Sequence, residues 1–191
     1  MNSSSKKKNG FDFNRELFDW AESLVTSLVI IVLLFAFAFR LIGVAGSSML
    51  PTLQDRNYLI VSDLGYEPES GDIVVVTKKG FLYNEKTGHE DSFVKRVIAT
   101  EGQTVDIDYY LGVVYVDGKA LDEPYTYTPT TRRGDMPFPC VVPEGHVFVL
   151  GDNRNGSTDS RNVEVGMIDE RYIVGRVLFR LLPLNQFGPV K

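Results

Sequence analysis

Residues 23–39 read Ser-Leu-Val-Thr-Ser-Leu-Val-Ile-Ile-Val-Leu-Leu-Phe-Ala-Phe-Ala-Phe, without a charged side chain. As an α-helix with a rise of about 1.5 Å per residue, this stretch would be about 26 Å long, slightly shorter than the ~30 Å hydrocarbon core of a bilayer. Arg40 follows, and then the apolar run 41–45. An arginine can extend its guanidinium to the lipid headgroups, so the helix can continue past Arg40. We therefore expect a transmembrane anchor over residues 23–45.

Two other interpretations of this stretch are open. The Ala-Phe-Ala at residues 36–38 resembles the cleavage site of a secretory signal peptide, but the apolar run is longer than a typical signal-peptide core and its leader is long and contains acids. A buried core helix is the second alternative, since the stretch is apolar on every face. The anchor remains the favoured interpretation.

The basic residues that flank the stretch predict its orientation. Residues 41–54 contain neither Lys nor Arg, whereas the first 22 residues contain Lys6, Lys7, Lys8 and Arg15. By the positive-inside rule, residues 1–22 form a cytoplasmic tail and residues 46–191 form an extracytoplasmic domain. Trp20 lies just before the apolar run, where an interfacial aromatic is expected. The sequence thus predicts a single-pass protein of the cell membrane, with the lipid bilayer as a partner.

Beyond residue 50 the chain reads as β structure. Short β-branched and aromatic runs recur between turn signals, at 58–62, 73–77, 93–99, 113–116, 146–150 and 172–182. Asp117-Gly118 is typical of a two-residue hairpin turn. We expect a mainly β domain, an antiparallel and partly closed barrel-like sheet, carried on the one N-terminal helix.

Two segments stand apart from this pattern. Prolines cluster between residues 124 and 143, so we expect residues 100–143 to form an excursion from the main sheet or a small subdomain. The first dozen residues are polar, and we expect them to be disordered.

Composition excludes several classes of function. The formal net charge is −5 and no basic surface stands out, so nothing points to nucleic acid. Two histidines and one cysteine are too few for most His/Cys metal cages, and we expect no metal and no cofactor. Cys140 has no second cysteine for an intramolecular disulfide.

Three segments carry candidate chemistry: Gly46–Thr52 (Gly-Ser-Ser-Met-Leu-Pro-Thr), Phe93–Ile98 (Phe-Val-Lys-Arg-Val-Ile) and Gly151–Arg161 (Gly-Asp-Asn-Arg-Asn-Gly-Ser-Thr-Asp-Ser-Arg). Gly71–Val75 (Gly-Asp-Ile-Val-Val) lies between the first two. Taken singly, each has an ordinary explanation: a juxtamembrane turn, an edge-strand lysine that opposes aggregation, and a long surface turn.

Together the segments suggest an activated serine. A serine hydroxyl is a weak nucleophile and needs a base to take its proton. His89 lies in a charged loop that we expect to be solvated, and a triad of a serine with His146 and Asp152 stays open. Lys95 can serve as the base only when neutral, and burial lowers the pKa of a lysine. Its apolar neighbours favour such burial, while strand alternation would turn Arg96 toward water.

The four segments, in this order behind an anchor, resemble the sequence boxes of bacterial type I signal peptidases. The resemblance covers about residues 24–179, with 100–143 matching only loosely. It implies a serine endopeptidase that removes signal peptides from exported preproteins.

The resemblance also implies roles for individual residues. Ser48 matches the nucleophile and Lys95 the general base. Ser157 matches a hydroxyl that hydrogen-bonds and orients the lysine, and Asp159 with Arg161 matches a supporting pair. Where some family members have a serine that helps form the oxyanion hole, this chain has Gly46, so the hole should rely on the Ser48 N–H, with the Gly46 N–H as a second candidate donor.

The implied reaction passes through an acyl-enzyme. Neutral Lys95 would take the Ser48 proton, protonate the leaving amine and then activate water. The family cuts after small residues at −1 and −3, and the alignment implies shallow pockets whose residues are Ile42, Val44, Ala45, Phe93 and Val94. Plain core packing is the ordinary alternative for these five.

Three rivals remain at this point. A self-cleaving repressor of related chemistry would carry a DNA-binding domain, which this sequence does not resemble. A membrane-tethered, non-catalytic β module would be expected to lose Ser48 or Lys95, and both are present. A specialised pilin-processing peptidase is not separated by these motifs.

Overall fold

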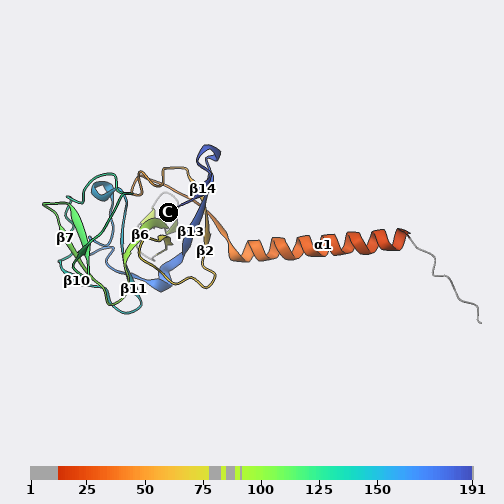
Figure 1. Ribbon diagram of the computed structural model, residues 1–191, viewed down its shortest axis with the longest axis horizontal. Helices are drawn as coiled ribbons and strands as arrows, with labels where there is room; N and C mark the ends of the chain where they lie inside the picture. Colours follow the sequence, from red (N-terminus) through yellow and green to blue (C-terminus); the bar gives the residue numbers. More distant parts are fainter. Residues whose placement is uncertain (1–12, 78–82, 85–88, 91, 191) are drawn as a thin grey trace, which may run out of the picture. The chain divides into compact units, whose positions relative to one another are not determined.

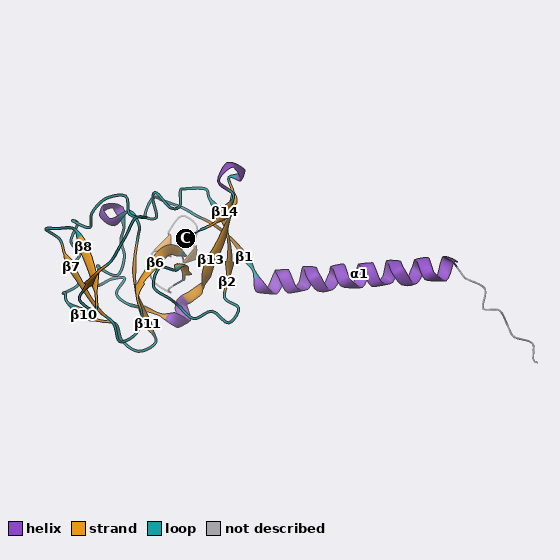
Figure 2. Ribbon diagram, in the orientation of Figure 1, coloured by secondary structure: helices purple, strands orange, loops and turns teal. Residues whose placement is uncertain are grey.

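The computed structural model describes residues 13–77, 83–84, 89–90 and 92–190 (Figure 1). The polar residues 1–12, for which disorder is expected, lie outside these ranges. The described chain divides into a unit that ends at Ala38 and a unit that begins at Phe39. Figure 2 distinguishes the one long helix of the first unit from the strands of the second.

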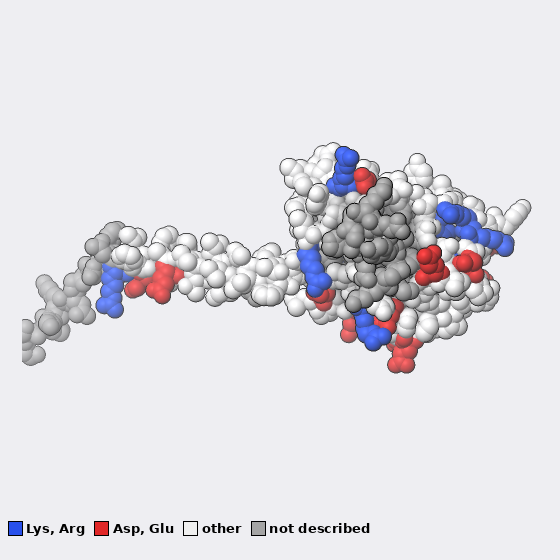
Figure 3. Space-filling view, turned by 180° about the vertical axis from the view of Figure 1, so that it is seen from behind, with Lys and Arg blue, Asp and Glu red and all other residues white. Residues whose placement is uncertain are grey.

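Helix α1 spans Phe13–Ala38. Its segment Arg15–Ala38 is long and apolar enough to cross a membrane, by length and composition. Its charged side chains gather near its N-terminal end, and the remainder is white in Figure 3. The expectation that the helix continues past Arg40 is wrong, because Arg40–Gly43 form strand β1, which pairs with the backbone of β2 instead.

The second unit contains an antiparallel sheet in the order β1-β2-β13-β3-β6-β11-β12, with β14 paired to β13. The expected mainly β, antiparallel and partly closed architecture is confirmed: β1 and β12 are the two ends of the strand order, and β-bulges interrupt the ladders of β11 and β13. The strands are β1 (Arg40–Gly43), β2 (Tyr58–Ser62), β3 (Ile73–Val76), β6 (Phe93–Ala99), β11 (His146–Leu150), β12 (Ile168–Asp169), β13 (Ile173–Leu182) and β14 (Gly188–Pro189).

Strands β3 and β6 are buried on both faces. In β3, Ile73 and Val75 pack with the side chains of β2, whereas Val74 and Val76 pack with those of β11. All seven residues of β6 are buried. Alternating side chains point to opposite faces of a sheet, so burial of consecutive residues requires a layer on each side.

A second sheet supplies one of these layers. It has the order β10-β7-β8-β9, with β7 at Thr104–Asp108, β8 at Val113–Val116, β9 at Lys119–Ala120 and β10 at Cys140–Val141. Its inner side chains pack against Ile98 of β6 and Phe148 of β11. Asp117 and Gly118 both have positive φ angles, 51° and 74°, and form the expected turn between β8 and β9.

The remaining elements are short. Strands β4 (Tyr83–Asn84) and β5 (His89–Glu90) form a two-stranded ladder, and the side chain of His89 lies outside the described residues. Three 3₁₀ turns follow: η1 (Arg154–Gly156), η2 (Glu170–Tyr172) and η3 (Leu184–Gln186). Of these, η1 belongs to the third sequence segment with candidate chemistry.

Candidate active site

Ser48 and Lys95 meet although they are 47 residues apart in the chain. The Lys95 Nζ lies 2.9 Å from the Ser48 Oγ and 3.1 Å from the carbonyl oxygen of Val94. Ser48 lies in the turn that follows β1, and Lys95 lies in the middle of β6. The turn after the outer strand therefore contributes the serine, and a strand in the interior of the sheet contributes the lysine.

Burial makes Lys95 a suitable base. Its side chain is 3% exposed, and within the described part of the chain it forms no ion pair. Desolvation lowers the pKa of Lys95 to about 8, against weaker opposing attractions to Asp159 and Asp152. A lysine in water has a pKa of about 10.4, so the neutral amine is far more populated here at neutral pH.

The opposite face of β6 corrects the expectation for Arg96. This side chain does point away from Lys95, but it is 2% exposed rather than solvated. Its Nε and Nη2 each lie 2.8 Å from an oxygen of the Asp152 carboxylate, and its Nη1 donates to the carbonyl of Gly71. The segment expected to be a loose excursion covers this face of the sheet.

The loop Gly151–Arg161 holds the serine turn in place. The Asn153 N–H donates to the Ser48 carbonyl at 3.0 Å, and its Nδ2 donates to the Ser47 carbonyl at 3.1 Å. The Gly151 N–H donates to Asp159, whose carboxylate also accepts two bonds from the Arg161 guanidinium, at 2.7 and 2.8 Å. The expected Asp159–Arg161 pair is therefore present and buried, at the base of the loop.

The hydrogen bond expected between Ser157 and Lys95 is absent. The Ser157 hydroxyl is buried and has no hydrogen-bond partner among the described residues. The Lys95 amine bonds instead to Ser48 and to the adjacent backbone carbonyl. Ser157 packs closely against the Cα of Gly151, where an added Cβ would meet its Oγ at 2.3 Å.

Gly46 takes a different part from the one expected. Its φ of 95° is a backbone conformation that favours glycine, and its N–H donates to the Asp55 carboxylate at 3.1 Å. That donor is therefore engaged rather than free for an oxyanion. The Ser48 N–H, by contrast, has no acceptor in the part of the chain that the structure describes.

All five expected pocket residues line one groove beside the Ser48–Lys95 pair. The groove has a volume of about 840 Å³. Ile42, Val44 and Ala45 come from β1 and the residues directly after it, and Phe93 and Val94 come from the start of β6. Sequence reasoning missed the contribution of Leu41 and Gly43, since β1 was not expected to be a strand, and it also missed Ser92, which directly precedes β6.

The histidine alternative does not fit the geometry. The His146 Nδ1 lies 2.8 Å from the carbonyl of Glu144, and His146 pairs with Asp169 of β12. The Asp152 carboxylate bonds to Arg96 and Thr52. Among the described residues, no group of three or more His, Cys, Asp or Glu side chains could hold a metal ion.

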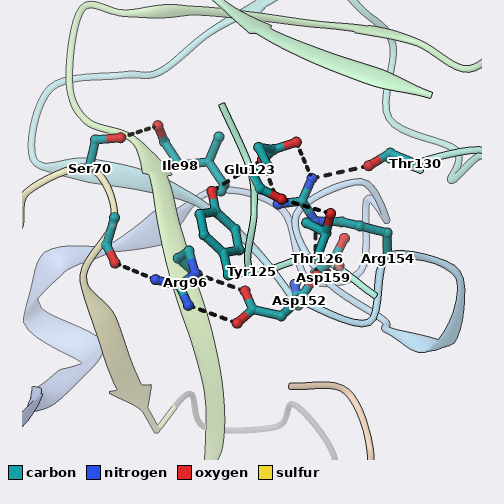
Figure 4. Close-up of polar contacts among 12 residues, drawn as sticks. Ser70, Arg96, Ile98, Glu123, Tyr125, Thr126, Thr130, Asp152, Arg154 and Asp159 are labelled. Atoms are coloured by element: carbon teal, nitrogen blue, oxygen red, sulfur yellow. Dashed lines mark hydrogen bonds and ion pairs between the residues drawn. The ribbon is translucent and has the colours of Figure 1, made fainter. Parts of the chain in front are cut away.

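Four polar residues around this loop were not assigned a contact from the sequence. Thr52 donates to the Asp152 carboxylate at 2.5 Å. Glu123 and Thr130 bond to Arg154, and the Tyr125 ring lies against Arg96 (Figure 4). No spacing in the sequence could have revealed these partners, because they come from segments far from one another in the chain.

Comparisons with known proteins show the family to which this chain belongs. Residues 17–182 match the family described as "Signal peptidase, peptidase S26". The chain is 38% identical over 169 residues to a "Probable signal peptidase I-1" of Synechocystis, covering 86% of this chain and 82% of that protein. It is 36% identical to the "Signal peptidase IB" of Staphylococcus aureus, covering 91% of this chain and 93% of that protein.

One solved structure is also similar. It is a signal peptidase I from Enterococcus faecalis V583, with 26% sequence identity and a TM-score of 0.45. The match covers 58% of this chain and 97% of that one.

The packing at Gly151 generates a prediction. A Cβ at this position would lie 2.3 Å from the Ser157 Oγ and 2.5 Å from the Ser48 carbonyl oxygen. Gly151→Ala should therefore push the serine turn away from Lys95 and lower kcat for peptide-bond hydrolysis by about 100-fold, as a displacement near 1 Å can. Gly118→Ala is the control: its φ of 74° strains the added side chain, but the methyl group meets open space in a turn of the second sheet, so kcat should stay unchanged. Wild-type kcat in Gly151→Ala would contradict the packing argument.

Proposed function

Because this chain belongs to the signal peptidase family, peptidase S26, and is a serine peptidase that removes signal peptides, we propose that Ser48 is its nucleophile and Lys95 its general base. The observation that carries the proposal is the 2.9 Å contact between the Ser48 hydroxyl and a lysine amine that is buried without a counter-ion among the described residues. The non-catalytic and pilin-processing alternatives are not favoured by these relatives.

The first half of the reaction acylates the serine. The neutral amine of Lys95 accepts the Ser48 proton as the Oγ attacks the scissile carbonyl carbon. The resulting ammonium gives that proton to the leaving nitrogen, which breaks the C–N bond and releases the mature protein. The signal peptide remains as an ester on Ser48.

The second half regenerates the enzyme. Lys95 takes a proton from water, the hydroxide attacks the ester carbonyl, and the proton returns to Ser48 as the signal peptide leaves. In both halves the Ser48 N–H, which has no acceptor among the described residues, supports one hydrogen bond to the developing oxyanion. The hydrogen bonds donated by Asn153 engage the carbonyls of residues 47 and 48.

The groove supports binding of an extended substrate segment. Strand β1 is the outer strand of the sheet, so one of its edges has no strand neighbour. The ladder between β11 and β6 pairs Arg96, Val97 and Ala99 of β6 and does not extend to Val94. Open strand edges offer backbone donors and acceptors to a peptide, and alternate side chains of that peptide then enter the groove.

The walls of the groove support a preference for small residues. Ile42, Val44 and Val94 present branched side chains close to the catalytic pair, and none of them is polar. Alternate residues of an extended peptide point the same way, so the first and third residues before the cut would face these walls. We therefore assign the pockets for small residues at −1 and −3 to this groove, with exported preproteins as the substrates.

The family and the apolar helix fit a membrane-anchored protein. We infer a single pass, with residues 1–22 in the cytoplasm and the unit after α1 outside. The basic residues before the helix support this orientation. Ser48 follows the end of α1 by only ten residues, which supports a site close to the outer lipid surface, where signal peptides emerge.

Removing either member of the pair should abolish turnover. Ser48→Ala lacks the attacking oxygen, and Lys95→Met keeps much of the volume but lacks the base. Each should reduce preprotein cleavage in detergent micelles by at least about 1,000-fold. Ser47→Ala is the matched control and should cleave normally. Substantial activity in Ser48→Ala or in Lys95→Met would refute the assignment.

The pH dependence should report the lysine. Only the neutral amine accepts a proton, so kcat/KM should rise with pH through an apparent pKa near 8. Two pH units below that value about 1% of the enzyme is in the active form. A profile measured from pH 5 to 10 tests this, and His146→Ala should leave its acid limb in place. An acid limb that moves or disappears in His146→Ala would instead implicate the histidine.

The lone cysteine offers a test of orientation. Cys140 is partly exposed, and burial raises the pKa of its thiol, so labelling is best done at mildly alkaline pH. In intact cells or right-side-out vesicles, a membrane-impermeant maleimide should label wild type but not Cys140→Ser. A cysteine placed at Ser4 in the Cys140→Ser background should be labelled only after permeabilisation. The reverse pattern would mean that the catalytic unit faces the cytoplasm.

A further inference from the structure

The segment 123–130 lies between β9 and β10 of the second sheet and forms hydrogen bonds with the catalytic loop at residues 151–161. It follows strand β9 and contains no regular element of its own. Its polar groups nevertheless point toward the loop at residues 151–161 (Figure 4). Glu123 and Thr130 both accept from the Arg154 guanidinium, and the Tyr127 N–H donates to the Asp152 carbonyl at 3.4 Å. The segment is therefore attached to the loop at positions 152 and 154.

Tyr125 lies between two buried guanidinium groups. The Arg96 guanidinium carbon is 3.8 Å from the centre of its ring, and that of Arg154 is 6.0 Å away. The Tyr125 hydroxyl donates to Glu123 at 3.2 Å. A flat aromatic face attracts a guanidinium and restricts its rotation. Tyr125 thus favours the one orientation of Arg96 in which both of its bonds to Asp152 are made.

The Arg96–Asp152 pair lies next to both catalytic groups. Arg96 follows Lys95 directly in β6. Asp152 accepts from Thr52, four residues after Ser48, and Asn153 beside it donates to the Ser48 carbonyl. A rotation of Arg96 would release Asp152, and with it the support of the serine turn.

Glu123 holds the second buried arginine, Arg154. Arg154 is fully buried, and its Nη1 and Nη2 lie 2.9 and 2.6 Å from the two Glu123 oxygens. Its Nε donates to the carbonyl of Gly151. Removal of one partner from a buried pair leaves an uncompensated charge, so Arg154 would reorient and carry the backbone at Gly151 with it.

We propose that Tyr125 and Glu123 are positioning residues for signal-peptide cleavage: through Arg96–Asp152 and through Arg154 they hold the serine turn and the lysine strand at reacting distance. The inference rests on the Ser48/Lys95 assignment. It gives the second sheet a part in the reaction, because the strands at 104–120 carry the segment that bears these two side chains. Neither residue touches the groove residues at 41–49 or 92–95 in the contacts described above.

The test replaces the ring while keeping an apolar side chain. Tyr125→Leu should lower kcat for preprotein cleavage by about 10- to 100-fold with KM changed less than about threefold, since the defect lies in alignment of the reacting groups. The acid limb of the kcat/KM profile should move to higher pH by about half a unit, because an Asp152 carboxylate less compensated by Arg96 favours the ammonium form of Lys95. Tyr125→Phe keeps the ring and should stay within about threefold of wild type.

Matched variants separate positioning from folding. Tyr110 belongs to the same second-sheet region but is 94% exposed, so Tyr110→Leu should cleave normally. A role confined to folding would lower the amount of active enzyme at every pH and leave the acid limb in place. Thermal unfolding of each variant in the same micelles measures the folded fraction. If Tyr125→Leu does not fold, Glu123→Gln decides, with an expected loss of about threefold to tenfold in kcat and the same direction of pH shift.

Two results would overturn the inference, and they are distinguishable. Folded Tyr125→Leu and Glu123→Gln with wild-type kcat and an unmoved acid limb, alongside an inactive Ser48→Ala, would remove the positioning role and leave the catalytic pair intact. An active Ser48→Ala would remove the catalytic pair, and the positioning role would fall with it.

Discussion

The site depends on keeping one amine dehydrated and without a counter-ion in a region rich in carboxylates. Asp152 and Asp159 both attract a proton toward Lys95, yet each carboxylate is bound by two nitrogens of its own arginine. If either carboxylate turned to the lysine, the charged form would be stabilised and the base would be lost. The buried Arg–carboxylate pairs therefore do more than support the loop: they bind the carboxylates of Asp152 and Asp159 to arginines, so that neither pairs with Lys95. A buried ion pair does not in general stabilise a protein much, so keeping Lys95 free of a counter-ion gives a functional reason for burying these pairs.

Much of the fold follows from local pattern, and the exceptions have physical causes. Runs of β-branched residues predicted the strands 58–62, 93–99, 113–116 and 146–150 with the bounds that the structure has, since burial and β propensity coincide there. Strand β1 was missed because its apolar residues continue those of the helix, and only pairing with β2 shows where the helix must end. Strand β7 alternates in burial but contains three polar residues at 104–108, a weak signal in a single sequence.

The site shows the same division between local and long-range information. The segment around Lys95 already indicated a buried lysine, and residues 42, 44, 45, 93 and 94 line the groove as expected. Arg96 was placed in water because alternation says which face a residue takes but not whether that face is covered. The cover comes from the second sheet and the segment 123–130. The bond from the Gly46 N–H to Asp55 depends on the path of a turn, and the lack of a hydrogen-bond partner for the Ser157 hydroxyl among the described residues depends on close packing, neither of which composition encodes.

The course of β1 has a consequence for the lifetime of the enzyme outside its bilayer. Only Phe39 separates the end of α1 from the first residue of the sheet. Proteolytic nicking at that joint would shed the anchor and leave every strand paired, a soluble fragment with its groove complete. Nicking a few residues later, beyond Gly43, would strip away the outer strand, expose the backbone edge of β2 and remove Leu41, Ile42 and Gly43 from the groove. Whether a released catalytic unit keeps its complete sheet thus depends on which peptide bond between residues 38 and 44 is cut.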